Sequence, residues 1–488
     1  MAQRPARGRT GGDDLSQTAA APKRGFIATM LIFSTSAMPL GALGLAMAIY
    51  VQPYFAQDLG VGLVMIGAAF GVVRLIDLFI DMLLALAMDR TRTRIGRYRP
   101  WLLLGAPILM VAVYQLFMAQ RGIGMGFLVV WLLVMNLGNS ILLIARFAWS
   151  ATLVTRYSAR SLFYGVMAFV GIFGNILVLF VPVIASAFPH HTMASSVHLM
   201  GWMILALIPI TVVLTAALTP EQINPDAKTL RAPLTDYLDL VRRPEVLRLF
   251  LMSLFTTLGP GWMANLYIFF FTLARGFTTS QASLLLIFYV ASGALGAPLV
   301  GLLASRFSKH RTLITATVCY SLGLCTVMIV PKADFWLTVP VMMWCGFWGA
   351  GFDLMAGAMM ADVGDHVRLD QGKERMGLLY AVISLAGKLA NAGAVLIAYP
   401  LLAFLGFIPT LGVRNTPSAI SSLELCFILG PIFFVALGGA CCIGWKLDAN
   451  RHAQIRTELE ARDAALIETP INETAMEAPF APILSPRS

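Results

Sequence analysis

The sequence predicts an all-α membrane protein in which twelve transmembrane helices form two six-helix bundles. Three observations support this fold class: the composition, the number of long apolar runs, and one hydrophilic segment near the middle. Hydrophobic residues make up 58% of the 488 residues and charged residues only 12%, and the mean hydropathy is +0.78. A soluble domain carries about 25% charged residues. The composition therefore excludes an ordinary soluble enzyme, a disordered chain and a disulfide-stapled secreted domain.

The second observation is the number of apolar runs long enough to cross a bilayer. A spanning helix needs about 20 apolar residues, and in hydrocarbon only a helix satisfies its own backbone hydrogen bonds. We expect twelve such helices, at 26–54, 61–88, 101–119, 122–153, 162–187, 197–219, 247–274, 281–304, 312–330, 335–360, 377–404 and 420–445.

The third observation is the hydrophilic segment Thr219–Arg243, which follows the sixth run and divides the chain into two halves. Basic stretches after the second run (ALAMDRTRTRIGRYR) and the eighth run (GLLASRFSKHRT) faintly repeat one another. Two repeated six-helix bundles are the plan of a major facilitator transporter. We expect a disordered cytoplasmic tail at 1–24, bundles at 25–219 and 246–446, a cytoplasmic linker at 220–245 and a cytoplasmic tail at 447–488 that begins with a short solvated helix.

The distribution of Lys and Arg predicts the orientation in the membrane. With both termini inside, 28 of the 35 basic residues fall in cytoplasmic segments and four in external loops. Cytoplasmic loops are enriched in Lys and Arg, so we expect a multi-pass protein of the inner (plasma) membrane with both termini cytoplasmic. The net charge of +10 is then loop charge that faces the lipid bilayer, and nucleic acid is not an expected partner.

Charged side chains inside the second run carry most of the functional information. Arg74, Asp77 and Asp81 in VVRLIDLFID have i, i+3 and i+7 spacing and share one helix face. A charge at mid-bilayer costs at least ~3 kcal/mol, so such residues mark ion pathways. Carboxylates are hard oxygen ligands, and two of them facing one cavity suit a monovalent cation or a proton. The alternative is a buried ion-pair lock with no role in transport.

Lys388 lies within the eleventh run, in LAGKLANAG. The small residues around it let a neighbouring helix approach closely. An ammonium group at this depth needs an anion, and the Asp77/Asp81 pair of the other half is the best candidate. Competition between this lysine and a bound cation for the carboxylates would couple the two halves. The alternative is a lysine that reaches out to the interface from a helix end.

Five residues are candidates for binding a solute. Arg146, in ILLIARFAWS, would contact an anionic or polar group of the solute or a span-two Asp, with an interfacial position as the alternative. Asp353, preceded by Trp344 and Trp348, predicts an aromatic face beside a carboxylate, which suits a sugar ring and its hydroxyls. The alternatives are packing or an interface belt for the tryptophans and an ion pair with a buried base for Asp353. Tyr50 is the fifth candidate, with packing as its alternative.

Four stretches in both halves resemble the glycoside–pentoside–hexuronide:cation symporters, the melibiose permease family. RLIDLFIDMLLALAMDRTRTRIGRYRPW is similar to the family's R-x-x-D-x-x-x-D-P, D-x-T and W-G-R-Y-R-P-W. AWSATLVTRYSARS is similar to AWGAEL-x-x-D-Y-x-x-R-S, and MMADVGDHVRLDQGKERMG to M-x-A-D-x-x-D-Y followed by G-x-R-x-x-G. Lys388 falls where the family has a lysine. The resemblance implies the major facilitator fold and cation-coupled symport.

The resemblance also implies residue roles. Asp77 and Asp81 correspond to the cation-site carboxylates, Arg74 to their helix neighbour and Lys388 to the cross-domain lysine. Ser140 replaces a threonine that is a cation ligand in the family.

Several positions depart from the family pattern. Met82 replaces the proline after the second Asp, and Ile80 replaces an asparagine that is a cation ligand. Isoleucine cannot coordinate Na⁺, so its presence favours H⁺ as the coupling ion. Three positions that bind galactosides in the melibiose permease hold apolar residues here, and Arg156 replaces the loop Asp. The apolar replacements are Ala46, Leu143 and Ala168.

The sequence therefore predicts a symporter that couples H⁺ or Na⁺ to uptake of a small molecule, a sugar or glycoside, acidic ones included. The alternatives are a cation-coupled carrier of a non-sugar amphiphilic or lipid-like solute, and a non-transporting membrane sensor. No nucleophile–base set stands out, so an enzyme is not expected. No cofactor is expected besides the coupling ion, and no metal site beyond Na⁺ at Asp77 and Asp81. The chain is expected to be a monomer.

Overall fold

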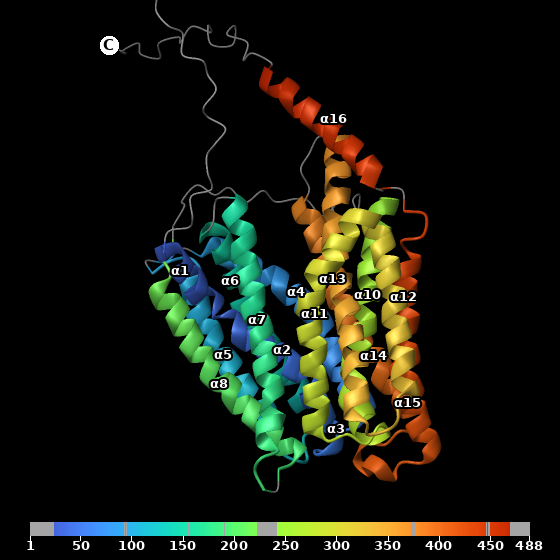
Figure 1. Ribbon diagram of the computed structural model, residues 1–488. Coiled ribbons are helices and arrows are strands. Elements are labelled where there is room, and N and C mark those ends of the chain that lie inside the picture. Colours follow the sequence, from blue (N-terminus) through green and yellow to red (C-terminus); the bar gives the residue numbers. More distant parts are fainter. Residues whose placement is uncertain are drawn as a thin grey trace, which may run out of the picture.

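The structure is a computed structural model that describes residues 24–91, 93, 95–153, 157–189, 191–221, 242–371, 376–445, 447 and 449–468. Nearly all of the predicted N-terminal tail, most of the predicted linker and the end of the predicted C-terminal tail lie outside these residues. Twelve helices in the described part are long and apolar enough to cross a membrane (Figure 1). The all-helical fold class and the number of spans predicted from the sequence are confirmed.

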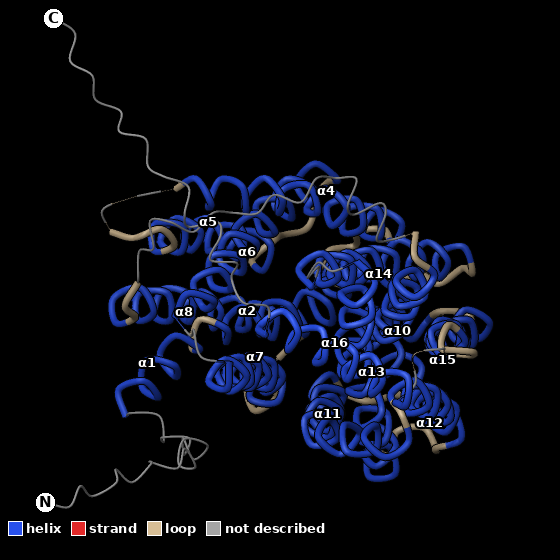
Figure 2. The backbone as a smooth tube through the Cα atoms, turned by 90° about the horizontal axis from the view of Figure 1, so that it is seen from above, coloured by secondary structure: helices blue, strands red, loops and turns tan. Residues whose placement is uncertain are grey.

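Helices of the N-terminal half lie beside one another on one side of the molecule when it is viewed from above, and those of the C-terminal half on the other (Figure 2). The first group contains α1 (Arg24–Ser34), α2 (Ala37–Ala46), the π-helical turn η1 (Met47–Val51), α3 (Gln52–Gln57), α4 (Leu63–Arg90), α5 (Arg99–Phe117), α6 (Met125–Leu153), α7 (Tyr157–Ala185) and α8 (Met193–Leu218). The second group contains α10 (Pro244–Phe269), the π-helical turn η2 (Phe270–Ala274), α11 (Thr279–Phe307), α12 (Lys309–Ile329), α13 (Phe335–Gln371), α14 (Met376–Phe404), the 3₁₀ turn η3 (Pro409–Arg414), α15 (Pro417–Ala440) and α16 (Ala449–Glu468).

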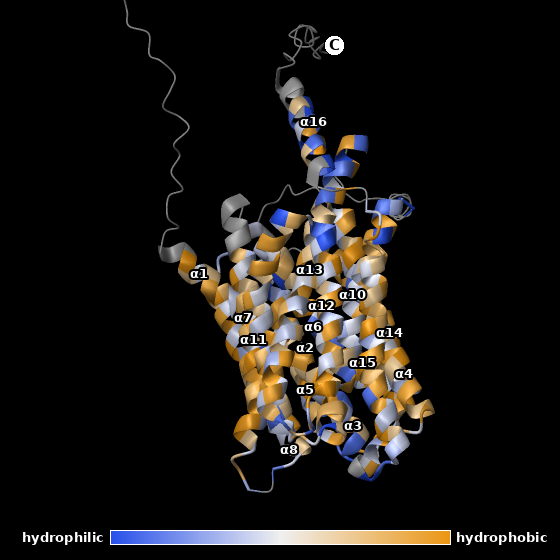
Figure 3. Ribbon diagram, turned by 45° about the vertical axis from the view of Figure 1, so that its right-hand side comes forward, coloured by the Kyte–Doolittle hydropathy of each residue, from blue (hydrophilic) through white to orange (hydrophobic). Residues whose placement is uncertain are grey.

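Hydrophobic residues predominate along the long helices, while hydrophilic residues gather at the two ends of the bundle and on α16 (Figure 3). Large apolar side chains such as Leu295, Leu302 and Phe433 are more than half exposed. A soluble protein rarely exposes so much apolar surface, so this belt is the surface that hydrocarbon covers.

The first span differs from its predicted form. One continuous helix was expected at 26–54, but the helix breaks at Thr35–Ser36 and resumes at Ala37. Pro39 supplies the reason, because a proline ring clashes with the carbonyl four residues earlier, here that of Thr35. The span then passes through the π-helical turn η1, which contains Tyr50, and ends at Gln57.

The tenth span also differs from its predicted form, because α13 continues eleven residues past the expected end at position 360. Its 37 residues correspond to about 55 Å at 1.5 Å per residue. A bilayer core is about 30 Å thick. The last turns of α13 therefore project beyond the other spans, at the end of the bundle where α16 lies (Figure 1).

The two halves pack closely toward the end of the bundle that carries α3 and η3, the α3 end. Gly67 of α4 has the backbone oxygen of Val395 and the ring of Pro400 from α14 at 3.2 and 3.1 Å from the place a Cβ would take. A Cβ on Gly71 would overlap the side chain of Leu396. Glycine at these two positions thus lets α4 approach α14.

Glu221, which follows α8, fixes the loop between α4 and α5. Its carboxylate accepts hydrogen bonds from the backbone N–H groups of Arg97, Tyr98 and Arg99, at 2.6, 2.7 and 3.4 Å. Gly96, with φ of +125°, gives the chain the turn that aims these N–H groups at one carboxylate. These residues belong to the G-R-Y-R-P stretch of the family motif, so the motif gains a structural role in holding this loop.

Replacing Glu221 with Ala should lower the free energy of unfolding by about 2 kcal/mol, the usual size for hydrogen bonds to a charged group. The measurement is thermal unfolding of the purified protein in detergent. Glu245→Ala is the control, because it also removes one carboxylate, here in the first turn of α10, for which the described residues show no hydrogen bond. Equal losses of stability in the two variants would contradict the role given to Glu221.

Candidate functional site

Lys388 of α14 joins the two halves by contacting both carboxylates of α4. Its Nζ lies 3.2 Å from Asp77 Oδ2 and donates a second hydrogen bond to Asp81 Oδ2. The three side chains keep 27%, 14% and 22% of their surface exposed. They lie near the middle of their helices, so the contact between halves expected from the sequence is present at the depth where a charge costs most.

Two oxygen atoms next to this ion pair are relevant to a coupling ion. Ser140 Oγ of α6 donates to Asp77 Oδ1 at 3.1 Å. Asp81 Oδ1 is buried and has no hydrogen-bond partner. A buried carboxylate oxygen without a donor is costly, and either a proton or a bound cation at Asp81 would satisfy it. Elsewhere in the described part of the chain, no three His, Cys, Asp or Glu side chains are grouped to hold a metal ion.

Arg74 lies one turn along α4 from Asp77, but no ion pair within 4.0 Å joins it to a carboxylate among the described residues. Lys388 occupies both carboxylates instead. The sequence predicted that Arg74 shares a helix face with the two carboxylates. It could not predict that Lys388 rather than Arg74 pairs with them, because that depends on how closely α14 approaches α4.

Arg146 of α6 is a buried cation without a partner among the described residues. Only 6% of its surface is exposed, and its Nε and Nη1 atoms are buried with no hydrogen-bond acceptor. Its guanidinium carbon lies 5.2 Å from the centre of the Phe147 ring. The interfacial position considered from the sequence requires a solvated head group, so this burial argues against it. A buried guanidinium with free N–H groups is chemically suited to an anionic or hydroxyl-rich ligand.

The expected aromatic face beside Asp353 is not formed, which corrects that part of the prediction. Residues nine apart on a helix point in opposite directions, and Trp344 donates its indole N–H to the Cys319 carbonyl of α12 at 2.8 Å. Trp348 packs edge-on against Trp344, with ring centres 5.9 Å apart. Asp353 is exposed and has no hydrogen bond or ion pair with another described residue. Asp353 is therefore accessible, but it lies apart from the two tryptophans.

Tyr50 lies in η1 with none of its surface exposed. Its hydroxyl is 2.6 Å from Ser283 Oγ at the start of α11, in the other half. Tyr267 of α10 reaches the same turn and donates to the Ala282 carbonyl at 2.9 Å. In this structure Tyr50 connects the halves at the α3 end rather than facing a solute. Ser283 was not singled out from the sequence, since a lone serine in an apolar run carries no signal.

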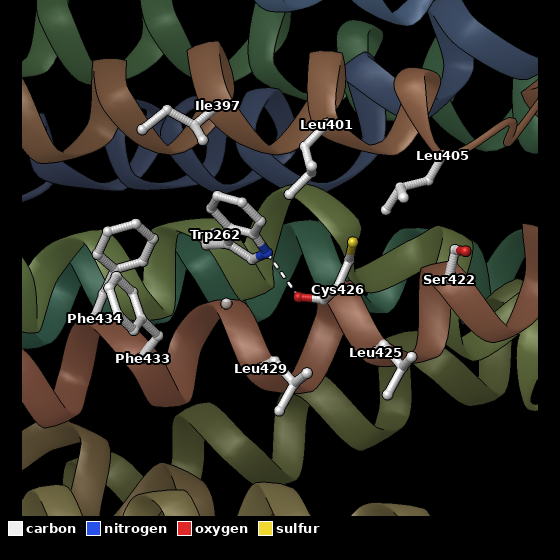
Figure 4. A pocket seen from close by; sticks show the side chains of 11 residues that line it. Trp262, Ile397, Leu401, Leu405, Ser422, Leu425, Cys426, Leu429, Phe433 and Phe434 are labelled. Carbon is white, nitrogen blue, oxygen red and sulfur yellow. Dashed lines mark hydrogen bonds between the residues drawn. The ribbon is translucent and has the colours of Figure 1, made fainter.

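A cavity of about 540 Å³ between α10, α14 and α15 is distinct from this site (Figure 4). Trp262 forms its floor and donates to the Cys426 carbonyl at 2.9 Å. Leu425, Leu429 and Phe433 on its rim are more than half exposed on the apolar surface. No charged side chain of the described residues lines the cavity, so it offers no carboxylate for a cation.

The family of the chain follows from its sequence as a whole. The family model described as MFS/sugar transport protein matches residues 32–449. This chain belongs to that family. The match begins within the first span and includes the other eleven spans in full. The resemblance to the melibiose permease family, based on four short motifs, is confirmed by this match over most of the chain.

Known relatives of this chain are distant in sequence, and each match covers at least 80% of its length. It is 23% identical to the "Uncharacterized symporter YnaJ" of Bacillus subtilis (strain 168), over 86% of this chain and 91% of the relative. It is 23% identical to the isoprimeverose transporter of Lactiplantibacillus pentosus, over 82% and 84%. It is 24% identical to the raffinose carrier protein of Pediococcus pentosaceus, over 80% and 63%.

Solved structures share the fold. A point mutant of the nucleoside transporter NupG superposes with a TM-score of 0.64 at 14% identity, over 86% of this chain and 100% of that chain. An inward-facing, unoccupied bacterial homologue of the human lysosomal transporter Spinster gives a TM-score of 0.63 at 14% identity, over 89% and 97%. Membership of the MFS/sugar transport protein family, together with twelve candidate spanning helices in the described residues, makes the chain an integral multi-pass membrane transporter of a small molecule rather than an enzyme.

Proposed function

We propose that this protein is a cation-coupled symporter of a sugar or glycoside that works by alternating access, with bundles at 25–219 and 246–446 as the two moving units. The single observation that carries the proposal is Lys388 of one half held between Asp77 and Asp81 of the other. A transporter gains coupling when one ligand changes the affinity of the other. A lysine that occupies the cation site until a cation displaces it supplies such a link.

The proposed cycle follows from this competition. A cation entering at Asp77 and Asp81 neutralises the carboxylates, so Lys388 loses its partners and the two halves lose a contact at the middle of the membrane. Solute and cation together then favour closure around the site, and release on the other side lets Lys388 return. The excess of basic residues at the α16 end supports placing that end, with both termini, in the cytoplasm of an inner membrane.

The oxygen donors near the carboxylates favour H⁺ over Na⁺. Na⁺ needs several oxygen ligands, and among the described residues only Ser140 adds a side-chain oxygen to Asp77 at hydrogen-bond distance. Ile80, on the same helix, offers none. A proton needs only one oxygen, and the unpartnered Asp81 Oδ1 can accept it.

A sugar is the favoured solute because two relatives carry sugars, isoprimeverose and raffinose, by their names. The galactoside-binding positions of the melibiose permease are apolar here, so a different set of polar groups must hold the solute. Within the described chain, Arg146 is buried and unpartnered, and Asp353 is exposed and unpartnered. A guanidinium without a counter-ion favours a solute that carries a carboxylate.

The test is uptake by the purified protein in liposomes under an imposed H⁺ gradient, a Na⁺ gradient, or neither. The solutes are isoprimeverose, raffinose, a hexuronide and a lysolipid as the amphiphile. We expect accumulation of a sugar that requires the H⁺ gradient and disappears when the gradient is collapsed. Equilibration without accumulation, or uptake of the lysolipid alone, would contradict the proposal.

Replacing Arg146 with Ala should weaken uptake of a hexuronide more than that of the matching neutral glycoside. A hydrogen-bonded charge pair is worth about 1.5–3 kcal/mol, so the KM ratio of the two solutes should change at least tenfold. The matched control is Arg121→Ala. Arg121 lies in the loop before α6 and donates to the Asp58 carbonyl, whereas Arg146 lies toward the opposite end of α6. An unchanged ratio in the Arg146 variant would remove this residue from the solute site.

A further inference from the structure

α16 is docked on the part of α13 that projects beyond the other spans. Helices α13 and α16 contact each other, and α16 buries Ile455 and Leu459 completely or nearly so. These residues are four apart and form one stripe on the helix. Arg462, one turn further on, lies 3.5 and 3.4 Å from the carbonyl oxygens of Arg368 and Leu369. The C-terminal helix thus runs along the projecting end of α13 (Figure 1).

His452 of α16 lies between two carboxylates of α13. Its Nε2 is 3.2 Å from Asp362 Oδ1 and 3.0 Å from Asp365 Oδ2. Lys309 of α12 also contacts Asp362 Oδ1, at 2.6 Å. Lys309 already offsets negative charge at Asp362, so a protonated His452 adds a favourable charge interaction with Asp365 that a neutral His452 lacks.

Two kinds of charged group at this junction cannot act as a pH-dependent link between α16 and α13. Some keep their charge near neutral pH, and others do not connect the two helices. Arg243 at the start of α10 pairs with Asp370 at 3.0 Å, and His366 lies 3.9 Å from the same carboxylate, on α13 itself. Histidine is the side chain that changes charge between pH 5 and 8. His452 is the histidine that bridges the two helices in the described part of the chain.

We propose that His452 is a pH-responsive latch that docks α16 on α13 when it is protonated and loosens it when it is neutral. The favourable charge interaction is present at low pH and is lost as the pH rises. Docked α16 braces α13, which is tied at the same place to α12 through Lys309 and to α10 through Arg243. It also rises obliquely toward the side of the N-terminal half (Figure 1). Docking therefore holds three helices of the C-terminal half together at this end, so acidification on this side slows the movement of that half that transport requires.

The docking can be measured without any transport, whereas its effect on rate rests on the proposed function. Spin labels at Arg456→Cys on α16 and Arg311→Cys on α12, both exposed positions, report their separation in full-length protein whose native cysteines are replaced by alanine. We expect the ratio of docked to undocked protein to fall about fivefold from pH 5.5 to pH 8, the size expected for the loss of two partly exposed ion pairs.

Three variants separate the latch from a general effect of pH. His452→Gln should stay in the mostly undocked state at both pH values, and His452→Arg should stay docked at both. His366→Gln is the matched control and should keep the wild-type response. A pH-independent docked fraction in the wild type, or an unchanged pH response in His452→Gln, would overturn the latch.

Transport by the same variants tests the regulatory effect. We expect His452→Arg to take up solute at least threefold more slowly than the wild type at internal pH 8, and at an equal rate at internal pH 5.5. Equal rates at both pH values, with the label distances behaving as expected, would overturn the regulatory effect alone. If the wild type moves no solute under any gradient, the proposed function fails, and the label distances still decide the latch.

Discussion

Asp77→Asn should abolish accumulation of solute against a gradient while solute-for-solute exchange continues. The substitution keeps the size of the side chain and the contact from Ser140, but removes a charge for which Lys388 and the cation compete. Coupling between two ligands is typically worth about 1–3 kcal/mol, so the steady-state accumulation ratio should fall at least about fivefold. The measurement is the accumulation ratio in liposomes, together with counterflow of labelled solute.

A matched control keeps this result specific. Asp58→Asn removes a carboxylate from the loop after α3, where burial raises the pKa of the Asp58 carboxyl against the opposing effects of Arg121 and His198. This variant should retain the accumulation ratio of the wild type. Full accumulation in Asp77→Asn would show that the carboxylate is a structural lock, which is the alternative left open from the sequence.

Gly71→Phe should stop transport by preventing closure at the α3 end. Even a Cβ at this position would overlap Leu396 of α14. A phenyl ring would demand that α4 and α14 separate, since overpacking a close contact costs about 1–3 kcal/mol or more. In every cycle of alternating access the transporter must close once at the α3 end and once at the opposite end. We therefore expect uptake to fall at least tenfold.

The opening itself can be measured at Ser283, whose hydroxyl meets Tyr50 across the two halves. In Ser283→Cys protein, a membrane-impermeant maleimide added from the α3 side should label the Gly71→Phe variant faster than the parent. Gly44→Phe is the control, because a Cβ on Gly44 meets no atom within 4 Å. Unchanged labelling with lost uptake would mean that the Gly71 variant is damaged in another way.

Helix number and type were predictable because the bilayer leaves the backbone a single choice. An apolar run of sufficient length must be a helix in hydrocarbon, and all twelve runs are helices. Helix interruptions and ends were less predictable. The break before Pro39 had a local signal that was present in the sequence. The extension of α13 to Gln371 had none, because charged residues such as Asp362 and Asp365 are compatible with a loop or a projecting helix.

The candidate site was predictable in part for the same reason. A charge in hydrocarbon is so costly that Asp77, Asp81 and Lys388 can be identified, and even paired, from hydropathy alone. Hydropathy alone could not show that Arg74 is left out of the ion pair with the two carboxylates. It also could not show that Trp344 lies apart from Asp353. The first depends on which cation reaches the carboxylates, and the second on the rotation of α13 against α12.

The number of spans, the family and the charged residues that need partners inside the membrane can all be inferred from the amino-acid order, because hydrocarbon imposes its costs on each helix separately. The packing of the helices then sets which partner each charge has, leaves Arg146 without a hydrogen-bonding partner among the described residues, and brings His452 to Asp362 and Asp365. Those outcomes depend on distances between helices that are far apart in the chain. Glycines such as Gly67 and Gly71 set how closely α4 and α14 approach, and their role cannot be recognised before the two helices are known to be neighbours.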